Sequence, residues 1–199
     1  ISSKLATSKD LFTSDKCNKW ITNIYSRARV HLLRANHDSI ITTSKTILED
    51  DPMLDCRIDG LQKYSPKRFI IDKNLSMPMT SKIIKTANKI PTYVFYNLID
   101  GNKLKKLSQL KVKTIRIDLR NNYLDFDKII LFLRKKGFYR IFVEAGIKFN
   151  NFLLDNCYIN DFYHFYSDQL FGNRGFHNAK IFFNKMNKLK RSKREIAIN

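Results

Sequence analysis

Short apolar runs alternate with helical patterns along most of this chain. Runs rich in Ile, Val, Phe and Tyr predict strands at residues 40–43, 68–72, 92–96, 112–117, 140–144 and 161–166, with a weaker one at 4–8. Apolar residues at helical spacing predict helices at 22–35, 80–89, 102–110, 125–137 and 147–155. Strands that alternate with helices are typical of an α/β domain with a largely parallel sheet.

Polar residues mark the ends of two predicted helices. Thr22 is the expected N-cap of helix 22–35, because its hydroxyl can accept a backbone N–H. The expected buried face of that helix consists of Ile24, Ala28, His31, Leu32 and Ala35. Asp125 is the expected N-cap of the helix that follows it, and Gly137 ends that helix. Its expected inward residues are Phe126, Ile129, Ile130 and Leu133.

The composition is that of a globular protein with an unusually basic charge. The chain has 199 residues, 43% of them hydrophobic, so it is long enough to bury a core. We expect one domain over residues 1–184 and a basic tail over 185–199, which is either a solvated terminus or a docking arm. The net charge of +19 favours polyanions as partners, although AT-rich coding, with its many Lys, Asn and Ile codons, would also produce it.

Several classes of site and location are disfavoured. The three cysteines are scattered without a C-x-x-C pair and the four histidines are isolated, which argues against a disulfide framework or a metal site. No apolar run approaches the roughly 20 residues that span a bilayer, and no signal sequence precedes the first strand. We therefore expect a cytoplasmic protein with no membrane partner.

The most informative stretch is 46–57, which reads T-I-L-E-D-D-P-M-L-D-C-R. It follows the predicted strand 40–43. Asp51-Pro52 should stop any regular element, because the residue before proline is disfavoured in the helical region. The pattern places a polar cluster beyond the end of a core strand, where α/β proteins usually bind ligands. An ordinary strand exit with acidic helix caps is the alternative interpretation.

This stretch resembles the signature T-[IV]-L-x-D-D-P-x-L-x-x-R of the pyrimidine reductase of riboflavin biosynthesis. The resemblance implies a dihydrofolate-reductase-like fold, with a central, mostly parallel sheet flanked by helices. It implies NADPH-dependent reduction of 5-amino-6-(5-phosphoribosylamino)uracil, a phosphorylated pyrimidine–ribose compound, to its 5-phosphoribitylamino product. By the same resemblance, Thr46 and Asp50 contact the cofactor, while Leu54 and Arg57 contact the substrate. No residue is singled out as a catalytic acid or base.

Segment 143–152 carries the resemblance further. It reads V-E-A-G-I-K-F-N-N-F and is similar to the family's V-E-G-G-x-x-L-x-x-x-[FL], with Ala145 in place of the first glycine. A helix N-terminus after a glycine offers N–H groups to a phosphate. The resemblance implies that Glu144 contacts the substrate, although alone it could be a strand-end carboxylate paired with a lysine. It implies that the cofactor pyrophosphate is held by Gly146, Ile147, Lys148, Phe149, Asn150, Asn151 and Phe152.

Three shorter matches complete the comparison. Segments 4–10 and 18–22 are similar to the family's K-x-A-x-S-x-D and S-K-W-I-T. They imply that Ala6 and Trp20 line the cofactor and that Lys4 and Asn18 contact the substrate, with Asn18 where the family has a serine. Segment 31–35 matches [HR]-x-L-R-A, so Arg34 is expected at the substrate phosphate. Separately, Asp72-Lys73 corresponds to the family's strand ending D-[ST/R], which implies that Lys73 meets the 2′-phosphate of NADPH.

Departures from the family pattern leave alternatives open. Leu11 and Phe12 replace a glycine and a basic residue, and no final strand is evident beside the basic tail. A catalytically decayed reductase is one alternative, and a basic nucleic-acid-binding α/β module is another, though it lacks an RNA-binding signature. No H-x-E…P-C-x-x-C pattern is present, so a zinc deaminase is expected on a separate or missing segment. The family's habit of self-association implies a homodimer.

Overall fold

The computed structural model describes residues 1–17 and 20–189. The chain divides into two compact units. The first unit consists of Ile1–Val30 and Ala145–Asn199, and the second unit of His31–Glu144.

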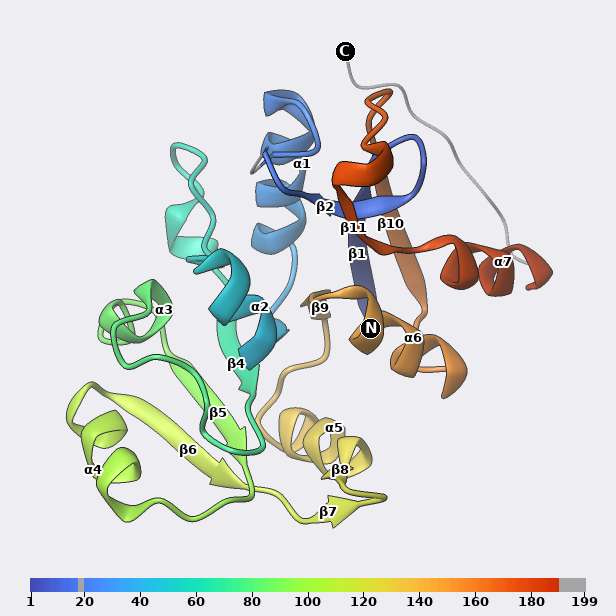
Figure 1. The fold of residues 1–199 in the computed structure, drawn as a ribbon. Coiled ribbons are helices and arrows are strands. Elements are labelled where there is room, and N and C mark those ends of the chain that lie inside the picture. Colours follow the sequence, from blue (N-terminus) through green and yellow to red (C-terminus); the bar gives the residue numbers. More distant parts are fainter. Residues whose placement is uncertain (18–19, 190–199) are drawn as a thin grey trace. The chain divides into compact units, whose positions relative to one another are not determined.

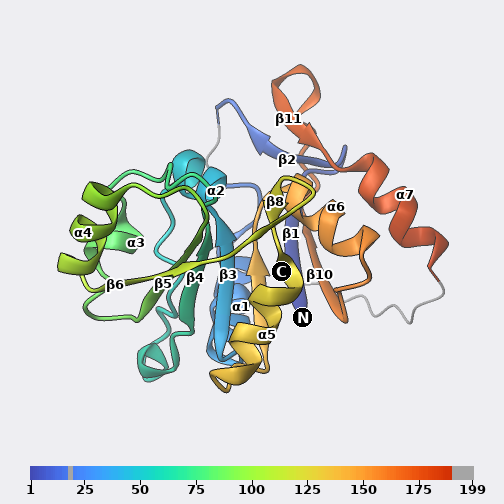
Figure 2. The same cartoon turned by 90° about the horizontal axis from the view of Figure 1, so that it is seen from below.

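The second unit is built on five parallel strands in the order β9-β3-β4-β5-β6 (Figures 1 and 2). Their bounds are Ser39–Thr43 (β3), Lys67–Ile71 (β4), Thr92–Tyr96 (β5), Val112–Arg116 (β6) and Ile141–Glu144 (β9). The five strands predicted in this unit are confirmed to within one residue at each end. Apolar residues at the strand centres are fully buried, at 0% exposure: Ile40, Ile41, Phe69, Ile70, Val94, Phe95, Phe142 and Val143. Burial of consecutive residues explains why these strands are continuous apolar runs rather than alternating ones.

Four helices lie within the second unit: α2 (Ser44–Asp50), α3 (Lys82–Lys85), α4 (Gly101–Gln109) and α5 (Phe126–Lys135). A 3-10 turn (Gln62–Tyr64) and a small antiparallel pair, β7 (Leu119–Arg120) with β8 (Tyr123–Leu124), complete it. The Asp125 side chain accepts hydrogen bonds from the N–H groups of Asp127 and Lys128, as expected of an N-cap. Phe126, Ile129 and Leu133 are buried as predicted, whereas Ile130 is only half-buried.

In the second unit, one prediction is confirmed and one is corrected. Part of the polar stretch 46–57 is helical, and the Thr43 side chain caps this helix, α2, directly after β3. Helix α2 ends at Asp50, and Asp51 has a positive φ of 42° just before Pro52, so the predicted stop is confirmed. The helix predicted at 80–89 is reduced to the single turn α3.

Helix α1 (Ile24–Ala35) contains the sequence boundary between the two units. Thr22 is not its cap, because the Asn23 side chain accepts the hydrogen bond from Ser26 N, at 2.8 Å. The predicted buried face is also wrong, since Ile24 is 61% exposed. The buried residues of the helix are Ser26, Val30, Leu33 and Arg34. The helix therefore buries a face that includes a charged residue, which a hydrophobic pattern cannot indicate.

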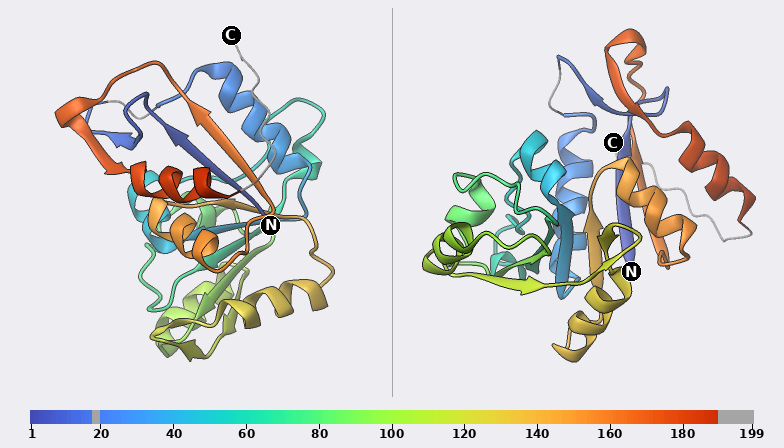
Figure 3. Two further views of the ribbon diagram at one scale, coloured as in Figure 1. Left: turned by 90° about the vertical axis from the view of Figure 1, so that its right-hand side faces the viewer. Right: turned by 60° about the horizontal axis from the view of Figure 1, so that its bottom comes forward.

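Besides the first part of α1, the described residues of the first unit form two strand pairs and the helices α6 and α7. Strand β1 (Ser2–Thr7) pairs in parallel with β10 (Asp161–Tyr166), which has the predicted bounds. Helix α6 (Ile147–Asp155) also has its predicted bounds, and α7 (Lys180–Lys188) lies beside it in both views of Figure 3. Lys185 Nζ forms an ion pair with Asp155 Oδ1 at 2.6 Å, which links the two helices. The predicted domain end at residue 184 falls inside α7, and residues 190–199 of the predicted tail lie outside the described residues.

The second strand pair of the first unit was not predicted. Strand β2 (Phe12–Asp15) lies in a stretch for which no element was predicted, and it pairs antiparallel with β11 (Gly175–Asn178), a strand that precedes the basic tail. A Cβ atom on Gly175 would lie 2.3 Å from Phe12 Cγ, so only glycine fits there. The Asp10 carboxylate accepts hydrogen bonds from the N–H groups of Phe171 and Gly172, which fixes the chain before β11. No helix in the described part of the chain is long and apolar enough to cross a membrane.

Candidate functional site

Arg34 and Glu144 form a buried, two-point ion pair within the second unit. Arg34 Nε donates to Glu144 Oε1 at 2.6 Å, and Nη2 donates to Oε2 at 2.9 Å. Their side chains are 11% and 12% exposed. Burial alone would lower the pKa of the Arg34 guanidinium, but the Glu144 carboxylate raises it above its usual value. Both residues were predicted to contact substrate, and the structure brings them together against each other.

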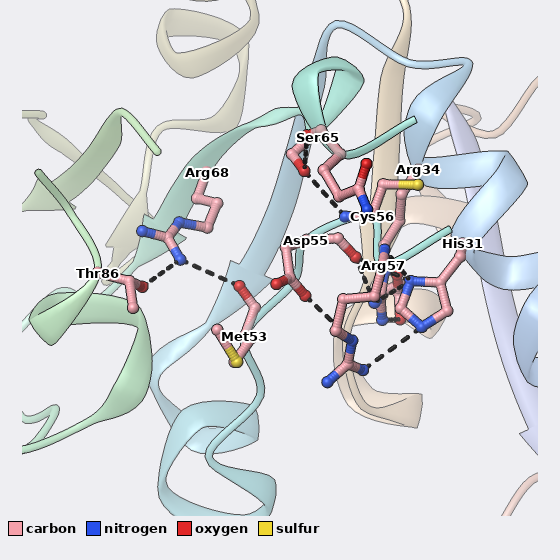
Figure 4. A network of polar contacts seen from close by, with 11 residues as sticks. His31, Arg34, Met53, Asp55, Cys56, Arg57, Ser65, Arg68 and Thr86 are labelled. Atoms are coloured by element: carbon pink, nitrogen blue, oxygen red, sulfur yellow. Dashed lines mark hydrogen bonds and ion pairs between the residues drawn. The ribbon is translucent and has the colours of Figure 1, made fainter. Parts of the chain in front are cut away.

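The loop 51–57 is the second component of the site, and Arg34 also binds it. Arg34 Nη1 donates to the Asp55 carbonyl oxygen at 2.9 Å. His31, one helical turn before Arg34, places Nδ1 3.0 Å from the same oxygen, and Figure 4 shows it between Arg34 and Arg57. Cys56 N donates to Ser65 Oγ at 3.0 Å, which ties the loop to the segment before β4.

Arg57 presents a cation at the end of this loop. Its side chain is 55% exposed, and its Nε lies 3.5 Å from Asp55 Oδ1. Its Nη2 lies 3.4 Å from His31 Nε2. Burial, followed by the charges of Arg34 and Arg57, lowers the pKa of the His31 imidazole, so His31 is neutral near neutral pH. A planar guanidinium in this position suits a phosphate group.

Arg68 holds the same loop from inside the unit. It lies in β4 at 0% exposure and is a residue that the sequence patterns did not single out. Its Nη1 donates to the Met53 carbonyl oxygen at 3.1 Å and to Thr86 Oγ1 at 2.8 Å (Figure 4). Its Nε donates to Thr92 Oγ1 and its Nη2 to the Ile90 carbonyl oxygen, both at 3.0 Å. Burial lowers the pKa of Arg68 to about 10, with Asp55 acting in the opposite direction.

The loop has a backbone that few side chains tolerate without such support. Asp51 and Leu54 have positive φ values of 42° and 53°. Asp51 Oδ1 accepts the hydrogen bond from Lys82 N at 2.8 Å, and Leu54 is buried at 2% exposure. The loop is therefore fixed at Asp51, Met53, Asp55 and Cys56. These anchors set the position from which the Arg57 side chain extends.

The remaining predicted residues of the second unit are the cofactor candidates Thr46, Asp50 and Lys73. Thr46 is half-buried in α2 and its hydroxyl lies 3.1 Å from Thr43 Oγ1. Asp50 is exposed at the last position of α2. Lys73 follows β4, and its Nζ donates to the carbonyl oxygen and to Oδ1 of Asn122, at 3.0 and 3.2 Å. Lys73 is thus engaged with the β7–β8 turn and would have to leave it to bind a phosphate.

In the first unit, the start of α6 has the form that was expected of an anion site. Gly146 is exposed, and no side chain forms a capping hydrogen bond there. Asn150, fully buried, accepts a hydrogen bond from Ser3 Oγ and donates from Nδ2 to the Ala145 carbonyl oxygen at 2.8 Å. Because its amide is used in this way, Asn150 supports the turn and is not exposed to a ligand. Ile147 is buried, Lys148 is exposed, and Phe149, Asn151 and Phe152 are half-buried.

The other predicted residues of the first unit are on or after β1. Lys4 and Ala6 are half-buried on β1, and Lys4 Nζ lies 5.9 Å from the centre of the Phe165 ring. Trp20 is 56% exposed, so it is not a core anchor, and its ring faces the Arg27 guanidinium at 4.8 Å. Asn18 lies outside the described residues.

Three titratable residues of the second unit were missed as site residues: His31, Asp55 and Arg68. His31 was placed on a buried helix face and in the [HR]-x-L-R-A match without a role, and Asp55 was only a variable position in the 46–57 motif. The signal that could have found Asp55 is its position two residues before Arg57, within reach of that guanidinium. Nothing in the sequence marked Arg68 as a site residue, because a single arginine beside an apolar run is typical of the end of a strand.

Comparison with known proteins shows the family of this chain. The chain matches the RibD C-terminal domain family over residues 1–193. It is 32% identical to the riboflavin biosynthesis protein RibD of Chlamydia pneumoniae over 162 residues, 79% of this chain and 43% of that protein. It is 28% identical to the 5-amino-6-(5-phosphoribosylamino)uracil reductase of Buchnera aphidicola over 176 residues, 82% of this chain and 79% of that protein.

The structural comparison concerns the fold. RibD of Acinetobacter baumannii superposes with a TM-score of 0.73 at 23% identity, over 87% of this chain and 47% of that one. The predicted dihydrofolate-reductase-like α/β fold is confirmed. The chain spans less than half the length of the RibD proteins that it matches. With the family match covering nearly its whole length, this chain belongs to the RibD C-terminal domain family.

Proposed function

We propose that this chain is an NADPH-dependent oxidoreductase that reduces 5-amino-6-(5-phosphoribosylamino)uracil to the 5-phosphoribitylamino product in riboflavin biosynthesis. The observation that carries the proposal is the loop 51–57, fixed by Arg34 and Arg68 and ending in the exposed Arg57. Membership of the RibD C-terminal domain family supports it. The name of the Buchnera relative, a 5-amino-6-(5-phosphoribosylamino)uracil reductase, supports the substrate, because that comparison covers most of both chains.

In the second unit, Arg57 would bind the substrate phosphate, with Leu54 beside it on the fixed loop. The buried pair changes the role that we assign to Arg34. Its Nε and Nη2 are engaged with Glu144, so Arg34 holds the Glu144 carboxylate and the Asp55 carbonyl in place. Glu144 would then orient the pyrimidine or the ribose through whichever lone pairs Arg34 leaves available.

The cofactor would supply the hydride, and this chain's residues would bind and orient it. In the first unit, the uncapped start of α6 at Gly146 fits an anionic group, because its N–H groups face no capping side chain. Ala6 and Trp20 complete the proposed cofactor contacts there, whereas Lys4 and Asn18 are assigned to the substrate. In the second unit, we assign Thr46, Asp50 and Lys73 to the cofactor, with Lys73 favouring a 2′-phosphate and hence NADPH over NADH.

The test is turnover of the purified chain with NADPH and the phosphoribosylamino-uracil, followed by loss of NADPH absorbance. Substrate-dependent oxidation of NADPH, faster than that of NADH, would support the proposal. A thermal shift with NADPH but no turnover would instead identify a decayed reductase, because binding to the folded state alone raises the melting temperature. No shift and salt-dependent RNA binding would favour the nucleic-acid alternative. We also propose a homodimer, which sedimentation equilibrium would test.

A further inference from the structure

The neighbourhood of Arg57 in the second unit is nearly neutral in the free protein. The buried Arg34 faces Glu144, and the exposed Arg57 faces Asp55, so each of the two cations has a carboxylate opposite it. Asp55 Oδ1 is buried and, among the residues that the structure describes, accepts no hydrogen bond. A phosphate monoester carries up to two negative charges at neutral pH, so one guanidinium with a competing carboxylate balances it poorly. A second positive group is needed from within reach.

His31 is that group by position. Its ring is half-buried, and its Nε2 lies 3.4 Å from Arg57 Nη2, so the two nitrogens converge on the same space. An oxygen about 2.8 Å from each of two such donors can accept from both. Arg34 cannot supply this second contact in the same way, because Nε and Nη2 are engaged with Glu144.

The position of the ring makes Nε2 the nitrogen that faces the Arg57 guanidinium. Nδ1 faces the Asp55 carbonyl oxygen at 3.0 Å, the Arg57 backbone N–H at 3.2 Å and Arg34 Nη1 at 3.4 Å, so it has both an acceptor and donors beside it, and these contacts alone do not select one tautomer. In the protonated ring both nitrogens donate, with Nδ1–H directed at the Asp55 carbonyl oxygen and Nε2–H available to a phosphate, so the ring need not turn.

The charges that face His31 explain why it would change state on binding. Arg34 comes from α1, Arg57 and Asp55 from the loop, and Glu144 from β9 acts through Arg34. The two arginines and partial burial keep the free imidazole neutral. A phosphate placed between His31 Nε2 and the Arg57 guanidinium favours the protonated imidazole, because the ring then faces an anion as well as the arginines.

We propose that His31 and Arg57 together bind the phosphate monoester of the sugar-phosphate substrate, and that His31 Nε2 takes up a proton from solvent as the phosphate binds. This proposal rests on the proposed function, because that function makes the ligand a sugar phosphate. It assigns the second phosphate contact to His31 instead of Arg34, which becomes a positioning residue.

The experiment is a pH titration of the His31 imidazole by NMR in the full chain, alone and with ribose 5-phosphate, ribose or NADPH. His31 must be observed directly, because the phosphate itself titrates near pH 6. We expect saturating ribose 5-phosphate to raise the His31 midpoint by about one pH unit or more, which by linkage is tenfold tighter binding to the protonated form. Ribose and NADPH should leave the midpoint unchanged.

Two variants sharpen the result. At pH values below the His31 midpoint, His31→Gln should weaken ribose 5-phosphate binding several-fold. In this variant, the affinity should vary with pH only as far as the titration of the phosphate itself requires. His177→Gln, which changes an exposed histidine of the first unit, should change neither. The proposal is overturned if ribose 5-phosphate binds without moving the His31 midpoint, if NADPH moves it equally, or if ribose 5-phosphate does not bind. In each of those cases NADPH-dependent turnover could still support the proposed function, so the two proposals fail separately.

Discussion

Arg34 and Glu144 are 110 positions apart in the sequence and meet through two hydrogen bonds, Nε–Oε1 at 2.6 Å and Nη2–Oε2 at 2.9 Å. Their pairing joins the last turn of α1 to the carboxyl end of β9. It makes one rigid support from two residues that would otherwise be separate ligand contacts.

Removing one partner of this pair should be costly. Glu144→Gln leaves the Arg34 charge buried without a counter-ion, so we expect a loss of about 3–5 kcal/mol in the free energy of unfolding. Urea unfolding would measure it. The control is Glu49→Gln, which breaks the exposed Lys45–Glu49 pair on α2 and should cost under about 1 kcal/mol. Equal losses in the two variants would contradict the importance of the buried pair.

Replacing Arg68 should loosen the loop 51–57 as well as lower stability. Arg68→Met leaves the half-buried Met53 carbonyl and the buried Thr92 hydroxyl without their Arg68 donors, an expected loss of about 1–3 kcal/mol in unfolding free energy. Amide hydrogen exchange should rise at residues 51–57 more than in β5. Arg140→Met, at an exposed arginine paired with Asp38, serves as the control and should leave exchange in the loop unchanged. Uniform acceleration throughout the second unit would argue against a specific tie to the loop.

Arg57→Ala should weaken substrate binding far more than NADPH binding. The reason is that Arg57 ends the loop with an exposed guanidinium, while the proposed cofactor contacts come from other residues. Titration calorimetry with each ligand would measure the two changes. Arg134→Ala, at an exposed arginine on α5, matches the change in charge and should affect neither. If both ligands lost affinity equally in Arg57→Ala, the assignment would fail.

Asp10 should stabilise the first unit in a pH-dependent way. Partial burial alone would raise the pKa of its carboxyl, but hydrogen bonds from Ser8, Gly172 and Phe171 lower it from 3.8 to about 2. A lowered folded-state pKa gives stability that is present above the unfolded value and is lost as the pH falls toward the folded one.

The corresponding variant is Asp10→Asn. We expect its melting temperature to lie a few degrees below that of the wild type near neutral pH, with the gap closing as the pH falls from about 4 to about 2. Differential scanning calorimetry would follow both proteins. Asp168→Asn changes an exposed aspartate of the same unit and should show no such gap. A gap that stayed constant to low pH would mean that the Asp10 charge is not what stabilises the turn.

Local patterns predicted most of the regular structure. The Asp125 cap and the apolar spacing after it define α5, and α6 and β10 have their predicted bounds because their signals lie within a few neighbouring residues. The β2–β11 pair was missed because each strand is four residues long, half-buried or exposed, and held by a partner far along the chain. Such a strand has neither alternation nor a buried run to reveal it.

The site shows the same division. The motif around Arg57 identified the loop. No pattern could show that Arg34 is engaged with Glu144, or that Arg68 is buried and donates to the Met53 carbonyl oxygen. Those facts depend on contacts between segments, and a local sequence pattern predicts an arginine to be a surface residue. The sequence therefore indicated which residue types belong to the site, but it did not indicate which residues contact one another.

Asn150 limits how the turn before α6 can vary. Its oxygen accepts from Ser3 and its nitrogen donates to Ala145, so position 150 needs a donor and an acceptor on one short side chain. Asp lacks the donor and would set a charge beside a carbonyl oxygen, Leu lacks both groups, and Gln carries them one carbon further out. Relatives that keep this turn should therefore keep asparagine there, unless position 3 changes in the same lineage.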